Sequence, residues 1–399
     1  MYKSIFLVFI SLLFFTIGCQ ETDPVSVQPT AENPNLEESR LFHKHHAGAI
    51  TVLTRNVYVG TSTSGIMMAE DLTEIPLRAT EAFELLQATN FPERAYSLAK
   101  EIKMTKPALI GLQEISLVRM QTSSDFFAYP LPNAEDVVYD YLAILMQALA
   151  DYDLNYKVAG LVENFDIEVP MVVGLDANNE PLFGDIRLTD YDVVLARKEV
   201  GIENVVALNY QVNLPLADLG TEVFRGYVAV DAKVGRTKVR FVNTHLEAFT
   251  GDPEFDAIIE QVQNAQAMEL VASLAAEEKP IIMVGDFNSQ APYGTTYQYI
   301  LSEGFHDAWN TNLLTCNEDG FTFGHDPDLR NEFVDFYERI DYVFTRNPGD
   351  NLPLPTRVMV VGDEYRNRTP SGLWPSDHGG VAAKLKIPCY DGIFAHSFK

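Results

Sequence analysis

The chain has 399 residues, of which 47% are hydrophobic and 21% charged, a globular composition with enough apolar material for a buried core. The length fits a single large α/β domain, and no repeat of roughly 20 to 50 residues points to a solenoid or propeller. The formal net charge of −27 repels polyanions and excludes a protein that coats nucleic acid through a basic surface. It does not exclude a nuclease, because a bound metal ion supplies positive charge locally.

The first residues have the pattern of a targeting signal. Lys3 precedes an apolar run over residues 5–17, which is short for a membrane span and has the charged-then-apolar order of a signal peptide. The run ends at Gly18-Cys19, which resembles a bacterial lipoprotein signal, and that resemblance implies a lipid on Cys19. We therefore expect a signal peptide over 1–18 and a lipoprotein anchored at the bacterial outer membrane or cell surface, facing the periplasm or the outside. A plain signal peptide or an uncleaved anchor is the alternative.

Residues 19–47 are rich in Pro, Glu, Asn, Ser and Thr, which predicts a disordered tether after the lipidated cysteine. The folded domain is expected over 48–387, followed by a tail over 388–399. Cys316 and Cys389 are the other two cysteines. A disulfide between them is possible outside the cytoplasm, and sequence alone leaves it open.

From Ile50 onward the chain alternates between strand and helix patterns. Helices are predicted over Glu93–Met104, Asn133–Ala150 (capped by Asn133) and Phe255–Ala276. Residues 60–91 look like a long irregular insertion. Strands are predicted at Ile50–Tyr58, Ala108–Gln113, Tyr156–Glu163, Asp192–Ala196, Val205–Val212, Tyr227–Val234, Lys238–Thr244, Pro280–Gly285, Ile340–Phe344, Arg357–Val361 and Val381–Leu385. Many strands with few helices between the later ones predict an α+β fold with two packed sheets.

Short polar clusters stand at the ends of these apolar strands, where side chains from several strands can meet at one sheet edge. They are Asn56, Gln113-Glu114, Asn243-Thr244-His245, Gly285-Asp286-Phe287-Asn288, Arg339-Ile340-Asp341-Tyr342 and Ser376-Asp377-His378. The two-residue period of a strand puts Asp286 and Asn288 on one face. Each cluster alone is more often a turn or a cap than a site, but six in one order are far less common by chance.

The residue types in these clusters suit phosphate chemistry. Glu114, Asp286 and Asp377 offer hard oxygen ligands of the kind that Mg²⁺ or Mn²⁺ prefers. His245 and His378 can hydrogen-bond phosphate or move protons near neutral pH. An aspartate such as Asp341 can fix the tautomer of an imidazole.

The order of these clusters resembles the endonuclease/exonuclease/phosphatase superfamily, which includes deoxyribonuclease I, abasic-site endonucleases, neutral sphingomyelinases and inositol polyphosphate phosphatases. The resemblance covers roughly 48–387 and implies a four-layer α/β sandwich, with two packed mixed sheets flanked by helices and the site at one end. Two departures lie where substrate is chosen: Gly379-Gly380 follow Ser-Asp-His, where the family often has a bulky residue, and the insertion before Glu114 is long.

The same resemblance implies a role for each cluster in the attack of water on phosphorus. Glu114 would be the principal metal ligand, with Asn56 beside it and Asp377 near the metal or the water. Asp286 would orient the water or a metal, and Asn288 would hold a phosphate oxygen. His378, oriented by Asp341, would be the general base or a phosphate binder, and His245 would stabilise or protonate the leaving side.

The sequence defines the substrate less well than it defines the reaction. Arg366 and Arg368 lie close before the Ser-Asp-His cluster and could bind further phosphate, and Trp374 could stack a base or a lipid headgroup. Alternatively, these arginines pair with the protein's own carboxylates. Arg187, Asp190 and Asp192 could line the rim. A phosphodiesterase, either a nuclease or a sphingomyelinase-like phospholipase C, is the first expectation. A phosphomonoesterase of the inositol-phosphate type is the second, and a non-catalytic surface binding module is a third. The oligomeric state stays open.

Overall fold

The computed structural model describes residues 48–387 except 68, 70, 130, 217–220, 236, 313–318 and 348–352. The expectations for the signal peptide, Cys19, the tether, the C-terminal tail and the Cys316–Cys389 pair therefore lie outside the described residues. The chain divides into two units, Met1–His45 and His46–Lys399, and the fold described below belongs to the second. Within the described part of the chain, every helix is too short or too polar to cross a membrane.

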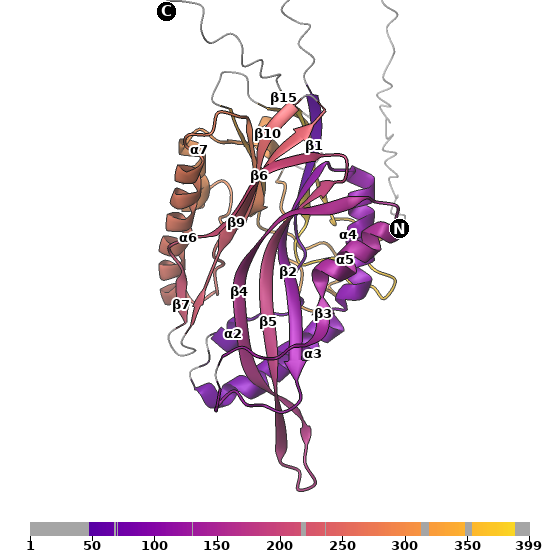
Figure 1. Ribbon diagram of the computed structural model, residues 1–399, viewed down its shortest axis with the longest axis vertical. Helices are drawn as coiled ribbons and strands as arrows, with labels where there is room; N and C mark the ends of the chain where they lie inside the picture. Colours follow the sequence, from indigo (N-terminus) through magenta and orange to yellow (C-terminus); the bar gives the residue numbers. More distant parts are fainter. Residues whose placement is uncertain are drawn as a thin grey trace, which may run out of the picture. The chain divides into compact units, whose positions relative to one another are not determined.

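Two mixed sheets form the centre of this unit (Figure 1). The first has the strand order β14 (Leu354–Val361), β15 (Gly380–Ile387), β1 (Gly48–Asn56), β2 (Leu109–Gln121), β5 (Pro181–Arg197), β4 (Tyr156–Leu175), with β3 (Asp136–Asp140) also paired to β2. The second has the order β12 (His306–Asp307), β13 (Asp341–Arg346), β11 (Ile281–Asp286), β10 (Thr237–His245), β9 (Gly226–Val234), β6 (Gly201–Asn209). The β1–β2 and β10–β11 pairs are parallel, so the carboxyl ends of those strands meet at one edge.

Apolar side chains from both sheets interdigitate between them, including Val52 and Leu109 from the first sheet and Val230 and Phe241 from the second. A second cluster joins the first sheet to α4 (Phe91–Thr105) and α5 (Tyr141–Asp151). A third joins the second sheet to α6 (Pro253–Ser273) and α7 (Thr295–Ser302). The helices thus cover the two outer faces (Figure 1), and the expected four-layer α/β sandwich is confirmed.

The prediction of a helix over residues 133–150 is wrong for the first part of that range. Residues 136–140 form strand β3, and the helix begins only at Tyr141, where Asp140 Oδ1 accepts a hydrogen bond from the Ala143 amide at 2.9 Å. The β-branched pair Val137-Val138 favours the strand, which pairs with β2. Of the two acidic residues that resembled a helical first turn, Glu135 precedes this short strand and Asp136 begins it.

The segment from 60 to 91 is more regular than expected. It contains α2 (Ser64–Met67), the 3₁₀ turn η1 (Leu72–Glu74) and α3 (Ile75–Ala88). Strands β4 and β5 also extend far beyond the predicted strands and form a long hairpin, whose turn is closed by Asp176 Oδ1 accepting from the Asn178 and Glu180 amides. Helix α3 packs on this hairpin through Ala79 and Val169 (Figure 1).

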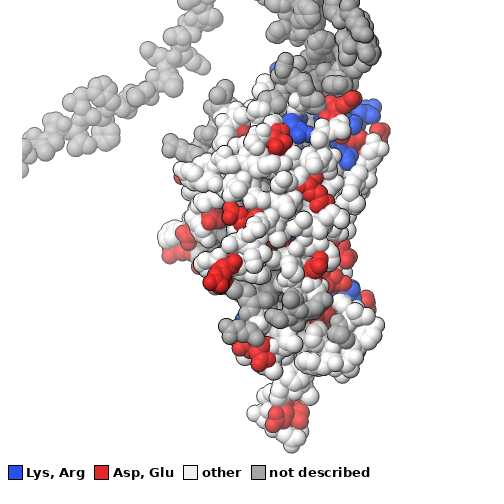
Figure 2. Space-filling model, turned by 90° about the vertical axis from the view of Figure 1, so that its left-hand side faces the viewer, with Lys and Arg blue, Asp and Glu red and all other residues white. Residues whose placement is uncertain are grey.

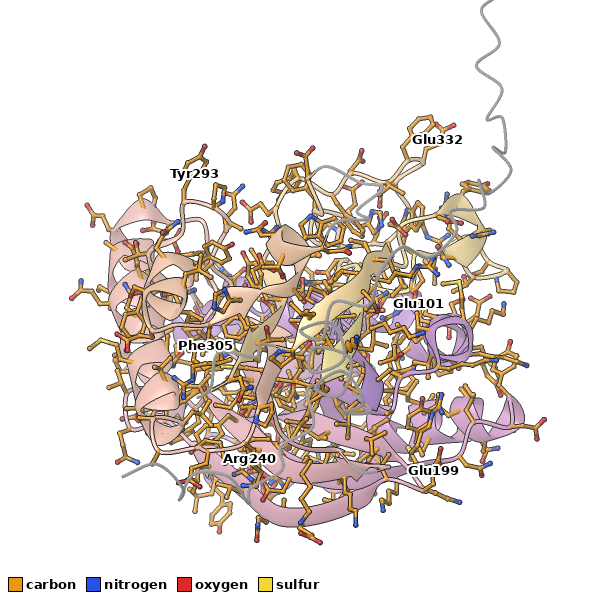
Figure 3. The ribbon with its side chains drawn as sticks, turned by 90° about the horizontal axis from the view of Figure 1, so that it is seen from above. Glu101, Glu199, Arg240, Tyr293, Phe305 and Glu332 are labelled. Atoms are coloured by element: carbon orange, nitrogen blue, oxygen red, sulfur yellow. The ribbon has the colours of Figure 1, made fainter. Side chains whose placement is uncertain are left out.

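Four short elements complete the fold. Strands β7 (Leu214–Leu216) and β8 (Thr221–Val223) form a small hairpin, and α8 (Ala308–Thr311) follows β12. The 3₁₀ turn η3 (Tyr365–Asn367) lies between β14 and β15. Figure 3, which looks onto the molecule from above, shows Glu101 inside the structure and Tyr293 and Glu332 projecting from its outer edge.

Candidate active site

Asn56 joins the two sheets at the edge where their parallel strands end. Its Nδ2 donates to Glu114 Oε1 at 2.8 Å and to Asp286 Oδ2 at 3.1 Å, and its Oδ1 accepts from the Tyr58 amide at 2.9 Å. Glu114 belongs to the first sheet and Asp286 to the second. The fully buried amide therefore positions one carboxylate from each sheet.

Glu114 owes its direction to an irregularity in β2. The register shifts between Leu112 and Ile115, and Glu114 lies there with φ of 58°, a left-handed conformation that costs a non-glycine residue about 1–3 kcal/mol. The bulge turns its side chain toward the sheet edge, where Oε2 accepts from the Val59 amide at 2.6 Å. Strain at a carboxylate that meets other polar side chains is typical of a functional site.

Three neighbouring strands bring the acid–histidine cluster together. His245 on β10 pairs in register with Asp286 on β11, and Asp286 pairs with Asp341 on β13. Asp286 Oδ2 lies 3.6 Å from Nε2 of His245 and 3.6 Å from Nε2 of His378. Asp286 is thus held between two imidazoles.

His378 is oriented by Asp341. Its Nδ1 lies 2.9 Å from Asp341 Oδ2, which leaves Nε2 facing Asp286. Burial disfavours the charged ring, but the carboxylates of Asp341, Asp286 and Asp377 outweigh this and raise the pKa of His378 to about 10. This shift favours the imidazolium form of His378 near neutral pH.

The carboxylates of this cluster are destabilised as anions. Burial, with the nearby Asp341 charge, raises the pKa of Asp286 to about 7. Burial, with the Glu114 charge, raises the pKa of Asp377 to about 6 although His378 opposes the shift. Like charges gathered out of water shift in this direction until a cation or a proton neutralises them.

Asn288 lies next to this cluster in a left-handed turn with φ of 48°. Its amide donates to Asp286 Oδ1 at 3.0 Å, and its Nδ2 donates to the Leu246 carbonyl at 3.0 Å. The backbone after β11 thus folds back to hold the second oxygen of Asp286.

His245 is oriented by an arginine that we did not single out from the sequence. Arg225 Nη1 lies 3.2 Å from His245 Nδ1, and the same guanidinium pairs with Glu247 at 3.2 Å. Burial, then the Arg225 charge, lowers the pKa of His245 well below its usual value. His245 is therefore a neutral ring.

Asp190 and Asp192, expected at the rim, instead lie buried beside His245. Asn164 Nδ2 donates to Asp190 at 3.3 Å, while both oxygens of Asp192 are buried, with no hydrogen-bond partner of good geometry among the residues that the structure describes. Burial raises the pKa of Asp190 to about 6. The site therefore carries a second acidic region on β5.

Two buried arginines hold the backbone of the site. Arg55 pairs with Glu101 at 3.0 Å and also donates to the His378 carbonyl. Arg94 donates to the Val57, Tyr58 and Pro375 carbonyls at 2.6, 3.0 and 3.0 Å. The sequence pattern did not identify Arg94 because an arginine on a helix normally faces solvent, and only its fully buried position shows the role.

The substrate residues expected near the Ser-Asp-His cluster are engaged within the protein. Arg366 is exposed and pairs with Glu364, and Arg368 donates to the Gly372 carbonyl at 2.7 Å through Nε. Trp374 is fully buried, stacks on His325 at 4.3 Å and donates to the Asn331 carbonyl. The interpretation of Trp374 as a stacking platform does not agree with this burial, because its ring faces are covered by protein.

The donor set fits a divalent cation of the magnesium type. Glu114, Asp286 and Asp377 gather hard carboxylate oxygens, with His378 as the cation nearest to them. Asp341 Oδ1 is buried without a hydrogen-bond partner. A divalent cation would supply the positive charge that this acidic cluster lacks, and Glu114 with Asp377 would hold it. The side-chain nitrogen of Asn56, and not its side-chain oxygen, points toward the carboxylates of Glu114 and Asp286.

Two packed mixed sheets with carboxylates and histidines converging at one edge define a class of phosphoester hydrolases. The family model described as the Endonuclease/Exonuclease/phosphatase family matches residues 88–378, and the chain belongs to this family. Its members are metal-dependent hydrolases of phosphate esters, so the chain is a hydrolase of this kind. No curated protein sequence matches the chain.

The chain is similar to solved structures at low sequence identity. A Bacteroides thetaiotaomicron member of the endonuclease/exonuclease/phosphatase family is 14% identical with a TM-score of 0.51, covering 86% of this chain and 96% of that one. The mannosyl-6-phosphatase Bt3783 of the same organism is 16% identical with a TM-score of 0.48, covering 84% and 99%. Truncated TDP2 from Caenorhabditis elegans is 16% identical with a TM-score of 0.46, covering 85% and 98%.

Proposed function

We propose that this protein is a phosphodiesterase that uses Mg²⁺ or Mn²⁺. The observation that carries the proposal is the position of Asp286 Oδ2, 3.6 Å from Nε2 of both His245 and His378 and tied through Asn56 to Glu114. A carboxylate between two imidazoles, beside further hard oxygen ligands, is suited to directing water at a phosphorus atom.

In the proposed reaction Asp286 orients the attacking water and takes its proton as the new P–O bond forms. His378, held by Asp341, donates a hydrogen bond to a phosphoryl oxygen through Nε2. His245 donates through Nε2 toward the leaving oxygen as the old P–O bond breaks. Glu114 and Asp377 would hold a metal ion, which would supply charge stabilisation for the phosphoryl group when bound. The Asn288 backbone amide holds Asp286 in place, and we propose that its side chain contacts a phosphoryl oxygen.

Charge favours a diester over a monoester. Arg55, Arg94 and Arg225 lie near the site, and each is occupied by protein carbonyls or carboxylates. A monoester dianion carries more negative charge than a diester and therefore needs more free cations. The face in Figure 2 carries scattered Asp and Glu side chains, with Lys and Arg gathered toward its upper end. An acidic surface of this kind also disfavours extended nucleic acid as a substrate.

A substrate panel tests the proposal. The full chain is incubated with Mg²⁺ or Mn²⁺ and with plasmid DNA, RNA, sphingomyelin, inositol phosphates and matched p-nitrophenyl diesters and monoesters. We expect hydrolysis of diesters that is lost with chelator and in Asp286→Asn. The matched control is Asp231→Asn, which removes a buried carboxylate at the far end of β9, where it pairs with Arg240. Activity limited to monoesters would overturn the assignment, as would diester cleavage that survives Asp286→Asn.

We also propose that Cys19 carries a lipid that anchors the protein at the outer membrane or cell surface, as the apolar run before Gly18-Cys19 indicates. Expression of the full chain in a bacterial host should place it in the membrane fraction, and Cys19→Ala should release it. Cys316→Ser should leave anchoring unchanged. Membrane association that survives Cys19→Ala would contradict the anchor.

A further inference from the structure

An apolar cavity lies between α3 and the long β4–β5 hairpin. Its volume is about 570 Å³ when the open solvent at its mouth is included. Ala79, Ala82, Phe83 and Leu86 of α3 form one wall, and side chains of β2, β4 and β5 form the other. Apart from two threonines, the lining is hydrocarbon.

Strand β5 connects this cavity directly to the acidic side of the active site. Asp192, Asp190, Leu188 and Ile186 alternate along the strand and so share one face of the sheet. The first two lie beside His245, and the last two line the cavity. Because alternate residues of a strand are about 7 Å apart, the cavity begins roughly one side-chain spacing beyond Asp190.

The pairing of the strands places the rest of this wall in the same order. Phe165 pairs with Asp190, Ile167 with Leu188, and Val118 with Leu188 from the other side. Paired residues of an antiparallel ladder point to the same face. From Asp190 to Leu188, this face of the first sheet therefore changes from carboxylate side chains at the site to apolar side chains in the cavity.

The segment after β1, which lines the opposite wall of the cavity, also contacts the active site. Thr61 lines the cavity, and two residues earlier the Val59 amide donates to Glu114 Oε2 at 2.6 Å. The cavity is thus bounded on both sides by segments that leave the catalytic cluster. Asp190 and Asp192 of β5 lie between His245 and this cavity along the same face of the strand.

We propose that this cavity binds the apolar substituent of the substrate, so that the enzyme acts on phosphodiesters carrying a hydrocarbon chain. This inference rests on the proposed phosphodiesterase activity. The lining has no charge to bind a second phosphate. A polyanionic chain following the same path would pass Asp190 and Asp192, which repel it. A hydrocarbon chain has no such penalty and loses contact with water on entering the cavity.

The test is a series of soluble p-nitrophenyl phosphodiesters that share one leaving group and carry a methyl, butyl or octyl chain. Burial of each methylene should lower KM by roughly fourfold until the cavity is filled, with little change in kcat. Ala82→Trp narrows the cavity and should raise KM for the octyl ester at least tenfold while leaving the methyl ester unchanged. The matched control is Leu77→Trp on the exposed side of α3, which should affect neither ester.

The outcomes separate the two proposals. If no ester of the series is cleaved, the phosphodiesterase proposal fails. If the methyl ester is cleaved but the wild-type KM does not depend on chain length, the cavity proposal fails and the phosphodiesterase proposal stands. The chain-length series uses the unmodified protein, so this result does not depend on how Ala82→Trp folds. Equal effects of Ala82→Trp and Leu77→Trp would also overturn the cavity proposal.

Discussion

Arg225 fixes the tautomer of His245. Its Nη1 lies 3.2 Å from His245 Nδ1, and because a guanidinium can only donate hydrogen bonds, Nδ1 must be the unprotonated acceptor. The single proton of the neutral ring is then on Nε2, the nitrogen that faces Asp286 at 3.6 Å. An arginine that resembles a structural ion-pair partner of Glu247 thus determines what His245 offers to a substrate.

Arg225→Gln should therefore lower kcat by roughly 10–100-fold, with a smaller change in KM, because the imidazole is no longer held in one tautomer. Nitrogen-15 NMR of the histidine rings checks the cause directly, since His245 should lose its single Nε2–H form. Arg240→Gln is the matched control, because Arg240 pairs with Asp231 at the other end of β10. Wild-type kcat together with an unchanged tautomer in Arg225→Gln would refute this role.

Asp341→Asn should reduce kcat by about 10²–10⁴-fold, because the amide preserves the size of the side chain but no longer supports the charged form of His378. The measurement is hydrolysis of a soluble phosphodiester, accompanied by thermal unfolding to show that the variant is folded. Asp231→Asn removes another buried carboxylate on the same sheet and should retain activity. Equal activities of the two variants would argue against the Asp341–His378 pair.

Glu101→Gln should destabilise the protein by about 3–5 kcal/mol. Glu101 and Arg55 are both about 1% exposed and lie 3.0 Å apart, so the substitution leaves a buried guanidinium without its counter-charge. Urea unfolding measures the change. The surface pair Lys238–Glu203 provides the comparison, because Glu203→Gln should change stability by less than about 1 kcal/mol. A similarly small effect at Glu101 would mean that the buried pair contributes little.

His325 should make stability depend on pH. Burial against Trp374, then the charges of Arg55 and Arg368, lowers the pKa of His325 to about 3, so the unfolded chain binds a proton between pH 6.5 and 3 that the folded chain does not. Stability is therefore complete above about pH 6.5 and falls as the pH drops, by about 2 kcal/mol at pH 5.

His325→Phe keeps the stack on Trp374 without the titrating ring. Between pH 7 and pH 5, measured with chelator present, the variant should lose about 2 kcal/mol less than the wild type. Identical pH dependence of the two proteins would show that His325 is not responsible.

The sequence predicts the sandwich well because its sheets obey local rules. Buried strands such as Ile281–Asp286 are continuous apolar runs ended by a polar cluster, and the parallel pairs bring those ends to one edge. His245, Asp286 and Asp341 could be expected to meet for this reason. In the structure these three residues pair in register across β10, β11 and β13.

The parts that could not be predicted depend on tertiary contacts. Val137-Val138 form a strand only because β2 offers an edge, and the acidic residues around them imitate a helix start. Arg94 acts through its full burial, and Arg225 acts through its contacts with His245 and Glu247, for which an isolated arginine gives no signal in the sequence. Trp374 seemed available to a substrate, but His325, fifty residues away in the chain, covers it. The cavity beside α3 needs the hairpin and the helix together.

The most direct test of the central claim is hydrolysis of a p-nitrophenyl phosphodiester in ¹⁸O-labelled water with Mg²⁺ or Mn²⁺, comparing the wild type with Asp286→Asn. We predict that the wild type places one ¹⁸O atom in the phosphate product and that Asp286→Asn or chelator abolishes the reaction. Label in the released alcohol, or hydrolysis that persists without the Asp286 carboxylate, would contradict attack of water on phosphorus at this cluster.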